Sequence, residues 1–285
     1  MMANIQKVAL ITDSSCDLSQ EMLDMHHIHM IPLRVAYSKG EFRDRLEISE
    51  NELYTVMSQE LPKTSLPFTE DVVALYTRLR EEGTTHVIHI SISSGLSGTY
   101  NMMKMITKEF EGDMKIALIN SKTLSTGLGL MILAAAEALE TTGSFEKAVE
   151  RAEAARETQL GMFIIKTLEF LRKGGRIGLV EGVIGTILQL KPVIYINPDG
   201  VYQTLAKARG YTNALDAMIR ETVARFGKRR IRLTVVHGAA AAEAQKLLEH
   251  LKELLNVADS FISSVSPVLA VHTGPGLLGI VAHEA

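Results

Sequence analysis

The segment THVIHISISSGLSGTYN, residues 85–101, passes from an apolar, β-branched run to a helix-like run through a cluster of hydroxyls and glycines. The residues Thr85–Ser93 predict a buried strand, and a helix is expected to begin at about Thr99. Open α/β sheets place ligands where a strand ends and a helix begins, because free backbone N–H groups and the positive end of the helix meet there. The segment therefore indicates an α/β fold with a candidate anion-binding site at this junction.

Strands and helices are expected to alternate through the first half of the chain. The expected strands are short and rich in β-branched residues, and they cover Lys7–Thr12, Ile28–Tyr37, Thr85–Ser93 and Met114–Asn120. One helix is expected to open at Asp17, two are expected to be capped by Ser49 and Thr69, and another is expected to begin near Thr99. Two longer helices are expected at Leu124–Leu139 and Phe145–Glu157. This order predicts a mostly parallel sheet in a three-layer α/β/α arrangement.

The pattern changes after about Leu160. A strand is expected at Gly161–Ile165, and two short helices are expected on either side of KGGRIG, residues 173–178. Two alternating runs in residues 191–209 are joined by Asn-Pro-Asp-Gly, which predicts an antiparallel hairpin. A helix, a strand, a second helix and two final strands are expected to follow. We therefore predict an N-terminal domain, 1–160, and a C-terminal α/β domain, 161–285, whose sheet is mixed or antiparallel.

The composition indicates an ordinary soluble protein. Hydrophobic residues make up 46% of the 285 residues and charged residues 22%, so the chain can bury a sizeable core. Cys16 is the one cysteine, which excludes an internal disulfide and a cysteine-based zinc site and suggests a reducing compartment. The apolar run before Asp13 is too short for a signal peptide or a membrane span. We expect a cytoplasmic protein without integral membrane association.

Basic residues are concentrated in one part of a chain whose net charge is −3. Residues 161–232 contain 13 Lys and Arg against 5 Asp and Glu, and they end in the cluster GKRRIR, residues 227–232. Two interpretations stay open: a solvated face with charges at helix ends, or a docking face for an acidic protein or a phosphate. Nucleic acid is the weaker expectation, because the aromatic residues are not interleaved with the basic ones.

The segment Gly95-Leu96-Ser97-Gly98-Thr99 matches one of three kinds of site. A nucleophile elbow requires G-x-S-x-G, and Thr99 stands where the last glycine should be. A phosphate-binding P-loop requires a lysine after the second glycine at fixed spacing, and none follows Gly98. A site that binds an anion needs only a hydroxyl and small residues at a helix start, which Ser97-Gly98-Thr99 supplies. A structural helix cap would explain Ser97 but not the surrounding hydroxyls and glycines.

Further polar residues are expected in loops, where they are compatible either with ligand binding or with a structural role. Thr64 and Ser65 lie between two prolines, where an ordinary turn is the simpler interpretation. Arg176 follows a double glycine and is suited either to a carboxylate or phosphate or to helix carbonyls. His272 and Thr273 are expected at the end of an apolar strand that enters a glycine-rich turn, where the imidazole could donate to an anion.

Taken together, these segments resemble the DegV family, the fatty-acid-binding subunits of bacterial fatty acid kinase. The resemblance runs nearly end to end and rests on TDSSCDL (12–18), PKTSLP (62–67), SSGLSGTYN (93–101), LRKGGRI (171–177), LKPVIYINPDG (190–200), KARGYTNAL (207–215) and HTGPG (272–276). Leu66 and Phe68 depart from the glutamine and the small polar residue usual in the family, and Asn120 departs from its usual aspartate. The first departure could alter the preference for the acyl chain or the mouth of the pocket.

The resemblance implies two α/β domains with one long-chain fatty acid buried between them and no cofactor. The implied carboxylate ligands are Thr64, Ser65, Ser97 and His272, with Gly98, Thr99 and Thr273 in support and Arg176 near the mouth of the site. A separate kinase subunit would use ATP to phosphorylate the bound carboxylate for phospholipid synthesis, so this chain would present the substrate without being catalytic. The alternatives are a serine-type acyl hydrolase using Ser97 and His272, and a nucleic-acid or regulatory binding module.

Overall fold

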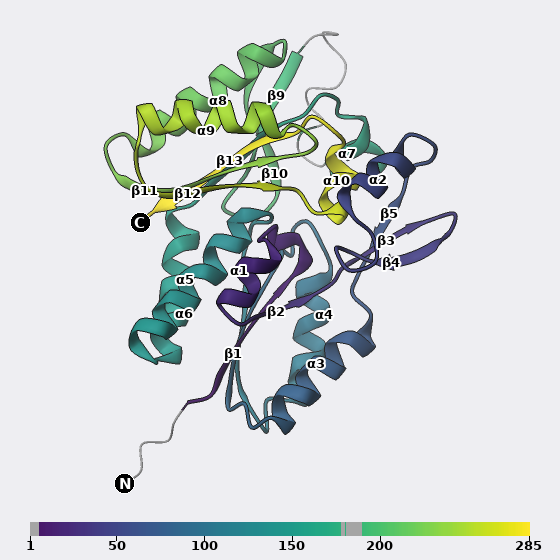
Figure 1. Ribbon diagram of the computed structural model, residues 1–285, viewed down its shortest axis with the longest axis vertical. Coiled ribbons are helices and arrows are strands. Elements are labelled where there is room, and N and C mark those ends of the chain that lie inside the picture. The colour runs from purple at the N-terminus through teal and green to yellow at the C-terminus, as the bar shows by residue number, and fades with distance from the viewer. Residues whose placement is uncertain (1–5, 178–179, 181–189) are drawn as a thin grey trace.

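The first sheet consists of parallel strands, as predicted. The computed structural model describes residues 6–177, 180 and 190–285. Four strands lie in the order β2-β1-β6-β7, and their bounds are β1 Val8–Asp13, β2 Ile28–Ile31, β6 His86–Ser91 and β7 Lys115–Asn120. Helices α3 (Thr69–Glu81) and α4 (Thr99–Ile106) cover one face, and α5 (Thr126–Thr142) and α6 (Phe145–Thr158) cover the other (Figure 1). The predicted three-layer α/β/α arrangement is confirmed.

Alternating side chains of β1 and β6 bind the two helical layers to the sheet. Ala9 and Val87 pack with Tyr76 of α3 in one buried cluster. Leu10 and Ile88 belong to another buried cluster, which contains α5 and α6. Successive strand residues point to opposite faces, so a strand buried on both faces reads as a continuous apolar run. The apolar run in residues 85–93 therefore provides the buried side chains on which the helices of both faces pack.

The predicted strand Ile28–Tyr37 is wrong as a single element. It is broken at Pro32, since β2 ends at Ile31 and β3 covers Arg34–Tyr37. Proline has no N–H to donate to a strand ladder, so the parallel pairing of β2 stops before Pro32. After Pro32 the chain leaves the parallel sheet, and β3 pairs antiparallel with β4 (Gly40–Arg43) and β5 (Lys63–Ser65). Figure 1 shows this small sheet at the side of the molecule, near α2 and α10.

Of the three residues predicted to open or cap a helix, Asp17, Ser49 and Thr69, two have another role in the structure. Ser49 caps α2 (Glu50–Met57) in a complete capping box, as predicted. Asp17 is buried and opens no helix, because Ser19 accepts the capping bond of α1 (Gln20–Met25). Thr69 is the first residue of α3 rather than its cap.

The C-terminal half forms a mixed sheet of six strands in the order β10-β9-β8-β13-β11-β12. The strands are β8 Leu160–Ile164, β9 Leu190–Ile196, β10 Tyr202–Arg209, β11 Arg230–His237, β12 Asn256–Ser264 and β13 Leu278–Glu284. The pair β11 and β12 is parallel, and the other neighbours are antiparallel, including the predicted hairpin β9–β10. The mixed sheet is therefore confirmed.

Helices cover both faces of this sheet as well. Met162 and Leu233 pack against α8 (Tyr211–Phe226) and α9 (Ala241–Leu254) in one cluster. Phe163 and Val236 face the other way and join the large cluster that contains α5. Figure 1 shows α8 and α9 above the sheet, and α5 below it. Because this cluster contains residues from both halves, the division into 1–160 and 161–285 stays a prediction.

One predicted final strand is a helix. Residues Pro267–Thr273 form α10, which places His272 in a helix and not at a strand end. The apolar run VLAV is too short for its periodicity to distinguish a helix from a strand. A proline at the first helical position, preceded by Ser266, was the available signal for a helix. Of the two short helices expected beside KGGRIG, α7 (Glu169–Lys173) is observed, and the other lies outside the described residues.

Two buried carboxylates of the N-terminal half hold the start of α10. Asp17 Oδ1 accepts from the Ser266 N–H at 2.8 Å, and Asp44 Oδ1 accepts from the Val268 N–H at 3.0 Å. Asp17 also accepts from the Ser125 hydroxyl at 2.5 Å. Burial raises the pKa of Asp17 to about 6 and that of Asp44 to about 7. These contacts fix the helix that carries His272 against the parallel sheet.

We predict that Asp44→Asn gains stability relative to the wild type as the pH rises. The folded protein holds the Asp44 proton until about pH 7, whereas the unfolded chain loses it near its ordinary pKa of 3.8. The favourable contribution of this carboxyl is therefore complete below the unfolded pKa and lost as the pH rises through the folded pKa. Asparagine keeps the acceptor oxygen and does not ionise. Urea unfolding measures the free energy of unfolding of the variant and of the wild type. Between about pH 4 and about pH 8, the variant should gain about 1–4 kcal/mol relative to the wild type.

The control is Asp259→Asn, since Asp259 is exposed on β12. Its difference from the wild type should stay nearly constant over the same pH range. A pH-independent difference for Asp44→Asn would contradict the assignment of a raised pKa to this carboxyl.

Candidate functional site

An apolar cavity lies between the inner face of the six-stranded sheet, the start of α5 and helix α10. Its free volume is about 40 Å³, far below the roughly 300–1,000 Å³ that is usual for ligand pockets, so a long hydrocarbon chain would enter only if the lining side chains move apart. Its lining is mostly apolar and consists of Leu124, Ser125, Met162, Phe163, Ile196, Tyr202, Val236, Val265, Leu269, Thr273, Leu277, Gly279 and Val281. We refer to it as the apolar cavity. A flexible hydrocarbon chain matches this lining.

A second, more open depression adjoins the apolar cavity. It is lined by residues 94–98, by Gly175 and Arg176, and by Val201 and Tyr202, and we call it the serine groove. No Asp or Glu is among these described lining residues, whereas Arg176 supplies a positive charge. Tyr202 lines both the serine groove and the apolar cavity. The two spaces therefore meet at this residue.

Two hydroxyls of the serine cluster lie at the start of α4. Ser97 Oγ is 2.8 Å from Thr99 Oγ1 and accepts from the Thr99 N–H at 3.3 Å. Gly98 is the N-cap residue and offers no side chain to the helix. The start of the helix carries about half a positive charge and unpaired N–H groups. This junction is suited to an anion, as the sequence predicts for such a position.

Thr64 and His272 come together although 208 residues separate them. Thr64 Oγ1 of β5 lies 3.0 Å from His272 Nε2 of α10, and Nδ1 of the same ring has no hydrogen-bond partner among the described residues. Burial, together with a smaller effect from the nearby charge of Arg176, lowers the pKa of His272 to about 3. The imidazole is therefore neutral at pH 7 and acts as a hydrogen-bonding group without charge.

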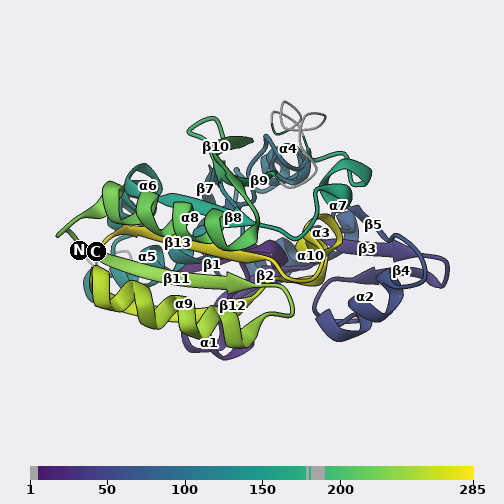
Figure 2. The ribbon, with the colours of Figure 1, turned by 90° about the horizontal axis from the view of Figure 1, so that it is seen from above.

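The KGGR loop connects this pair to the serine groove. Arg176 Nη1 donates to the Gly174 carbonyl at 2.8 Å, and its Nε donates to the Leu96 carbonyl at 3.4 Å. Gly174 packs so closely on His272 that a methyl group there would lie 2.2 Å from Nδ1. Figure 2 shows α7, which leads into this loop, close to α10, and the two elements are in contact. The segments around residues 64, 97, 176 and 272 therefore form one site.

The nucleophile and base of a hydrolase are not paired in this site. The hydroxyl of Ser97 bonds to Thr99, and His272 bonds to Thr64. A serine hydrolase requires its serine hydroxyl to be hydrogen-bonded to the histidine that accepts its proton. The structure gives no support to the hydrolase alternative.

Two implied ligands occupy different surroundings from the rest. Ser65 follows Thr64 in β5, where successive side chains point to opposite faces, so its contact with a carboxylate stays a prediction. Thr273 lines the apolar cavity, but its hydroxyl donates to the Leu269 carbonyl within α10 at 3.2 Å. That hydroxyl is already used by the helix.

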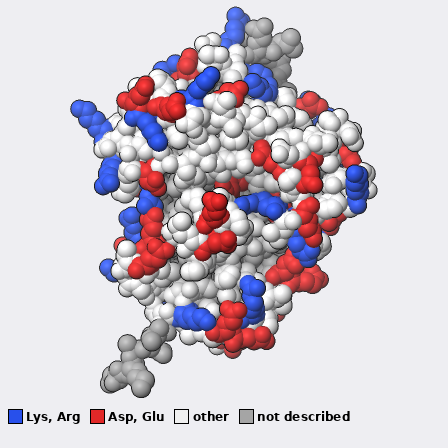
Figure 3. Space-filling view, in the orientation of Figure 1, with Lys and Arg blue, Asp and Glu red and all other residues white. Residues whose placement is uncertain are grey.

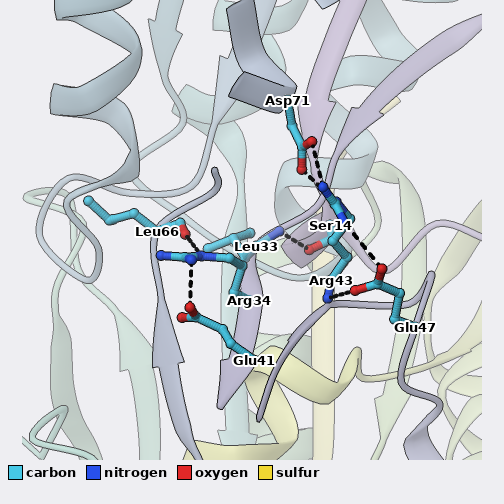
Figure 4. A network of polar contacts seen from close by, with 8 residues as sticks. All are labelled: Ser14, Leu33, Arg34, Glu41, Arg43, Glu47, Leu66 and Asp71. Atoms are coloured by element: carbon cyan, nitrogen blue, oxygen red, sulfur yellow. Dashed lines mark hydrogen bonds and ion pairs between the residues drawn. The ribbon is translucent and has the colours of Figure 1, made fainter. Parts of the chain in front are cut away.

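The departure at Phe68 helps to fix the loop that carries Thr64, whereas Leu66 takes part through its backbone carbonyl alone. Arg34 Nε donates to the Leu66 carbonyl at 2.6 Å, and the Arg34 guanidinium stacks on the Phe68 ring at 3.9 Å from its centre. Arg43, 5.0 Å from the same ring centre, binds both oxygens of Asp71. Figure 4 shows Arg34 and Arg43 anchoring this region of the chain. Phe68 is the N-cap residue of α3, the position that the sequence analysis assigned to Thr69.

The departure at Asn120 is explained by the turn that begins the serine cluster. Asn120 Oδ1 accepts from the Ser94 N–H at 3.2 Å, and its Nδ2 donates to Ser94 Oγ at 2.7 Å. An amide can do both, whereas a carboxylate can only accept.

Sequence reasoning missed Gly174 and Tyr202 as members of the site. A double glycine predicts a sharp loop but does not reveal that a histidine almost a hundred positions later packs on it. Tyr202 begins a strand in which buried and exposed residues alternate, and that alternation was the available signal that its ring faces inward.

The basic segment is partly neutralised in the structure. Arg229 pairs with Glu284 at 2.6 Å, and Arg232 pairs with Glu137 at 2.7 Å. On the face shown in Figure 3, acidic and basic residues are interspersed. A docking role for residues 227–232 stays a prediction.

The described part of the chain shows neither a metal-binding cluster nor a membrane-spanning helix. It contains no group of three or more His, Cys, Asp or Glu side chains arranged to hold a metal ion. None of its helices combines the length and the hydropathy that crossing a bilayer requires.

We predict that Gly174→Ala displaces the His272 ring and breaks its bond to Thr64. The added methyl group would overlap the imidazole, so the variant should lose about 1–3 kcal/mol of stability, measured by urea unfolding. In a His272→Ala background the same substitution should cost at least about 1 kcal/mol less, because the clashing ring is gone.

Gly112→Ala is the matched control, since nothing lies within 4 Å of a methyl group at that position. It should leave stability nearly unchanged. An equal cost of Gly174→Ala in both backgrounds would show that the contact with His272 is not the cause.

Comparison with known proteins gives a consistent result. The model of a family described as uncharacterised proteins of the DegV family matches residues 7–285. A DegV domain-containing protein of Clostridium acetobutylicum is 39% identical over 277 residues, which are 97% of this chain and 99% of the relative. A DegV family protein of Thermus thermophilus, described by its fatty acid binding, superposes with a TM-score of 0.91 at 32% identity, over 98% of this chain and 100% of its own.

A stearic-acid-binding protein of Eubacterium ventriosum also shares the fold, with a TM-score of 0.87 at 26% identity over 98% of both chains. The family match covers nearly the whole sequence, and the first relative exceeds 30% identity over almost its full length. The chain therefore belongs to the DegV family.

Proposed function

We propose that the chain binds a long-chain fatty acid, with the hydrocarbon tail in the apolar cavity and the carboxylate at the serine groove. The observation that carries this proposal is that Tyr202 lines both the apolar cavity and the groove containing Ser97 and Arg176. The descriptions of the related Thermus and Eubacterium proteins support it. The ligand would then lie between the two halves of the chain.

The carboxylate would be compensated by several donors. An ionised carboxylate cannot be buried bare, because the desolvation cost is prohibitive. The Ser97 hydroxyl, the start of α4 and the Arg176 guanidinium provide hydrogen bonds and positive charge. When Nε2 of His272 carries the proton, it donates to Thr64 Oγ1, which leaves the Thr64 hydroxyl proton for the ligand. The neutral imidazole thus orients Thr64.

The tail would supply most of the affinity. At about 0.8 kcal/mol per buried CH₂, about fourteen methylenes correspond to a gross gain of ~11 kcal/mol. Much of this gain is offset by the loss of freedom on binding. The head group therefore fixes the orientation of the acid more than its affinity.

We further propose that a separate kinase subunit phosphorylates the bound carboxylate with ATP, giving an acyl phosphate for phospholipid synthesis in the cytoplasm. The open serine groove supports this proposal, because a head group there lies near solvent, where a partner could reach it. In this scheme Arg176 lies at the mouth, and no residue of this chain carries out the transfer. The absence of a Ser97–His272 bond among the described contacts fits a binding role.

Purified protein extracted with organic solvent should release a long-chain fatty acid, detected by mass spectrometry. An apolar cavity of this kind is expected to retain its ligand through purification, since release would expose the tail to water. If none is found, stearate added to the protein should bind. Neither a bound acid nor uptake of added stearate would reject the proposed function.

Ser97→Ala should weaken stearate binding by about tenfold, because a hydrogen bond to a charged group contributes about 1.5–3 kcal/mol. Its melting temperature should stay within about 2 °C of the wild type, since Ser97 is partly exposed. Ser58→Ala, at the exposed end of α2, is the control and should bind normally. Unchanged affinity in Ser97→Ala would remove Ser97 from the head-group site.

A further inference from the structure

Tyr202 occupies a position that neither the sequence motifs nor the proposed ligand set includes. It is the first residue of β10 and is 5% exposed. Its ring packs edge-on against Phe163, with 5.2 Å between the ring centres and 70° between the planes. Phe163 lines the apolar cavity, whereas Arg176 lines the serine groove, and Tyr202 lines both. The residue is thus the boundary between the apolar and the polar part of the site.

The phenolic hydroxyl of Tyr202 has no hydrogen-bond partner among the described residues. Other tyrosines of the C-terminal half are satisfied: Tyr195 donates to Gln203 at 2.8 Å, and Tyr211 donates to the Gly276 carbonyl at 2.9 Å. The Tyr202 hydroxyl is not among the fully enclosed polar atoms that lack a partner, and Tyr202 lines the open serine groove, where a ligand can approach it. A ligand with an acceptor atom at this boundary would satisfy the hydroxyl.

The electrostatic surroundings favour a neutral donor here. Burial raises the pKa of Tyr202 well above its ordinary value, with a smaller opposing effect from Arg176 and a smaller raising effect from Asp17. The phenol therefore keeps its proton and can donate it. The effect of Arg176 places a positive charge near the hydroxyl, where a ligand carboxylate would also be attracted.

We propose that the Tyr202 hydroxyl donates a hydrogen bond to the carboxylate of the bound long-chain acid, and so marks the depth at which the head group stops and the tail begins. This inference rests on the proposed fatty-acid binding. Tyr202 would act together with Ser97 and Arg176, which line the serine groove with it. It distinguishes an acid from a neutral lipid of equal length, because hydrogen bonds to charged acceptors are stronger.

The test compares stearate with methyl stearate for delipidated wild-type protein and Tyr202→Phe. The variant keeps the ring and its contact with Phe163 and removes the hydroxyl alone. Stearate affinity should fall by about tenfold or more, whereas methyl stearate affinity should change by less than about threefold. Tyr195→Phe is the matched control, since it makes the same change in the neighbouring strand to a hydroxyl that is bound to Gln203. It should bind both ligands as the wild type does.

A second measurement needs no substitution. In wild-type protein labelled with ¹³C at the tyrosine ring carbon that bears the hydroxyl, the Tyr202 resonance should shift on addition of stearate and shift much less with methyl stearate. Equal losses for both ligands in Tyr202→Phe, or an unmoved resonance with stearate bound, would overturn this inference alone. Failure of the wild type to bind stearate would overturn the proposed function as well.

Discussion

The arrangement of this protein depends on buried carboxylates, because a carboxylate that is removed from water requires hydrogen-bond donors inside the fold. Asp13 accepts from the hydroxyls of Ser15 and Ser91 and from the Ile92 N–H at the end of β6. Asp17 and Asp44 accept from the N–H groups that begin α10. The desolvation of these groups is offset by hydrogen bonds that join the parallel sheet, the serine cluster and α10. The positions of Ser97 and His272 depend on these contacts.

The serine groove shows the complementary arrangement. Its described lining contains a guanidinium and hydroxyls but no acid of the chain itself. Arg176 donates to the Gly174 and Leu96 carbonyls, and the Ser97 hydroxyl bonds to Thr99. A groove with this charge suits an anionic head group, which the proposed fatty acid would supply.

The local pattern of the sequence was sufficient to predict most elements of the fold but not their meeting points. The strand at residues 85–93 and the Asn-Pro-Asp-Gly hairpin are encoded by neighbouring residues, so periodicity and turn chemistry find them. Pro32 was visible in the sequence, but its effect was missed because the apolar run continues across it. The helical state of α10 is set by Pro267 and by two distant carboxylates, and a short apolar run does not reveal them.

Local sequence patterns predict the candidate site less well than they predict the helices and strands. No spacing rule brings Thr64 to a histidine 208 residues away, and the grouping of these residues came from a family resemblance. The contact between Gly174 and His272 depends on a backbone approach that only the folded structure shows. Tyr202 carries no motif at all. Such a residue is found by asking which side chains line two adjacent spaces, a question that requires the whole fold.

Because His272 is neutral, it contributes a hydrogen bond to the site, and the positive charge comes from Arg176. An imidazolium buried beside Arg176 would repel it, and the low pKa of His272 reflects burial and this neighbour. A neutral ring can stay buried in the empty site at little electrostatic cost, while orienting the Thr64 hydroxyl. The positive charge is left to Arg176, which is only partly buried and keeps part of its hydration. Binding of an acid would therefore require no proton uptake by His272, and its pH dependence would follow the ionisation of the ligand.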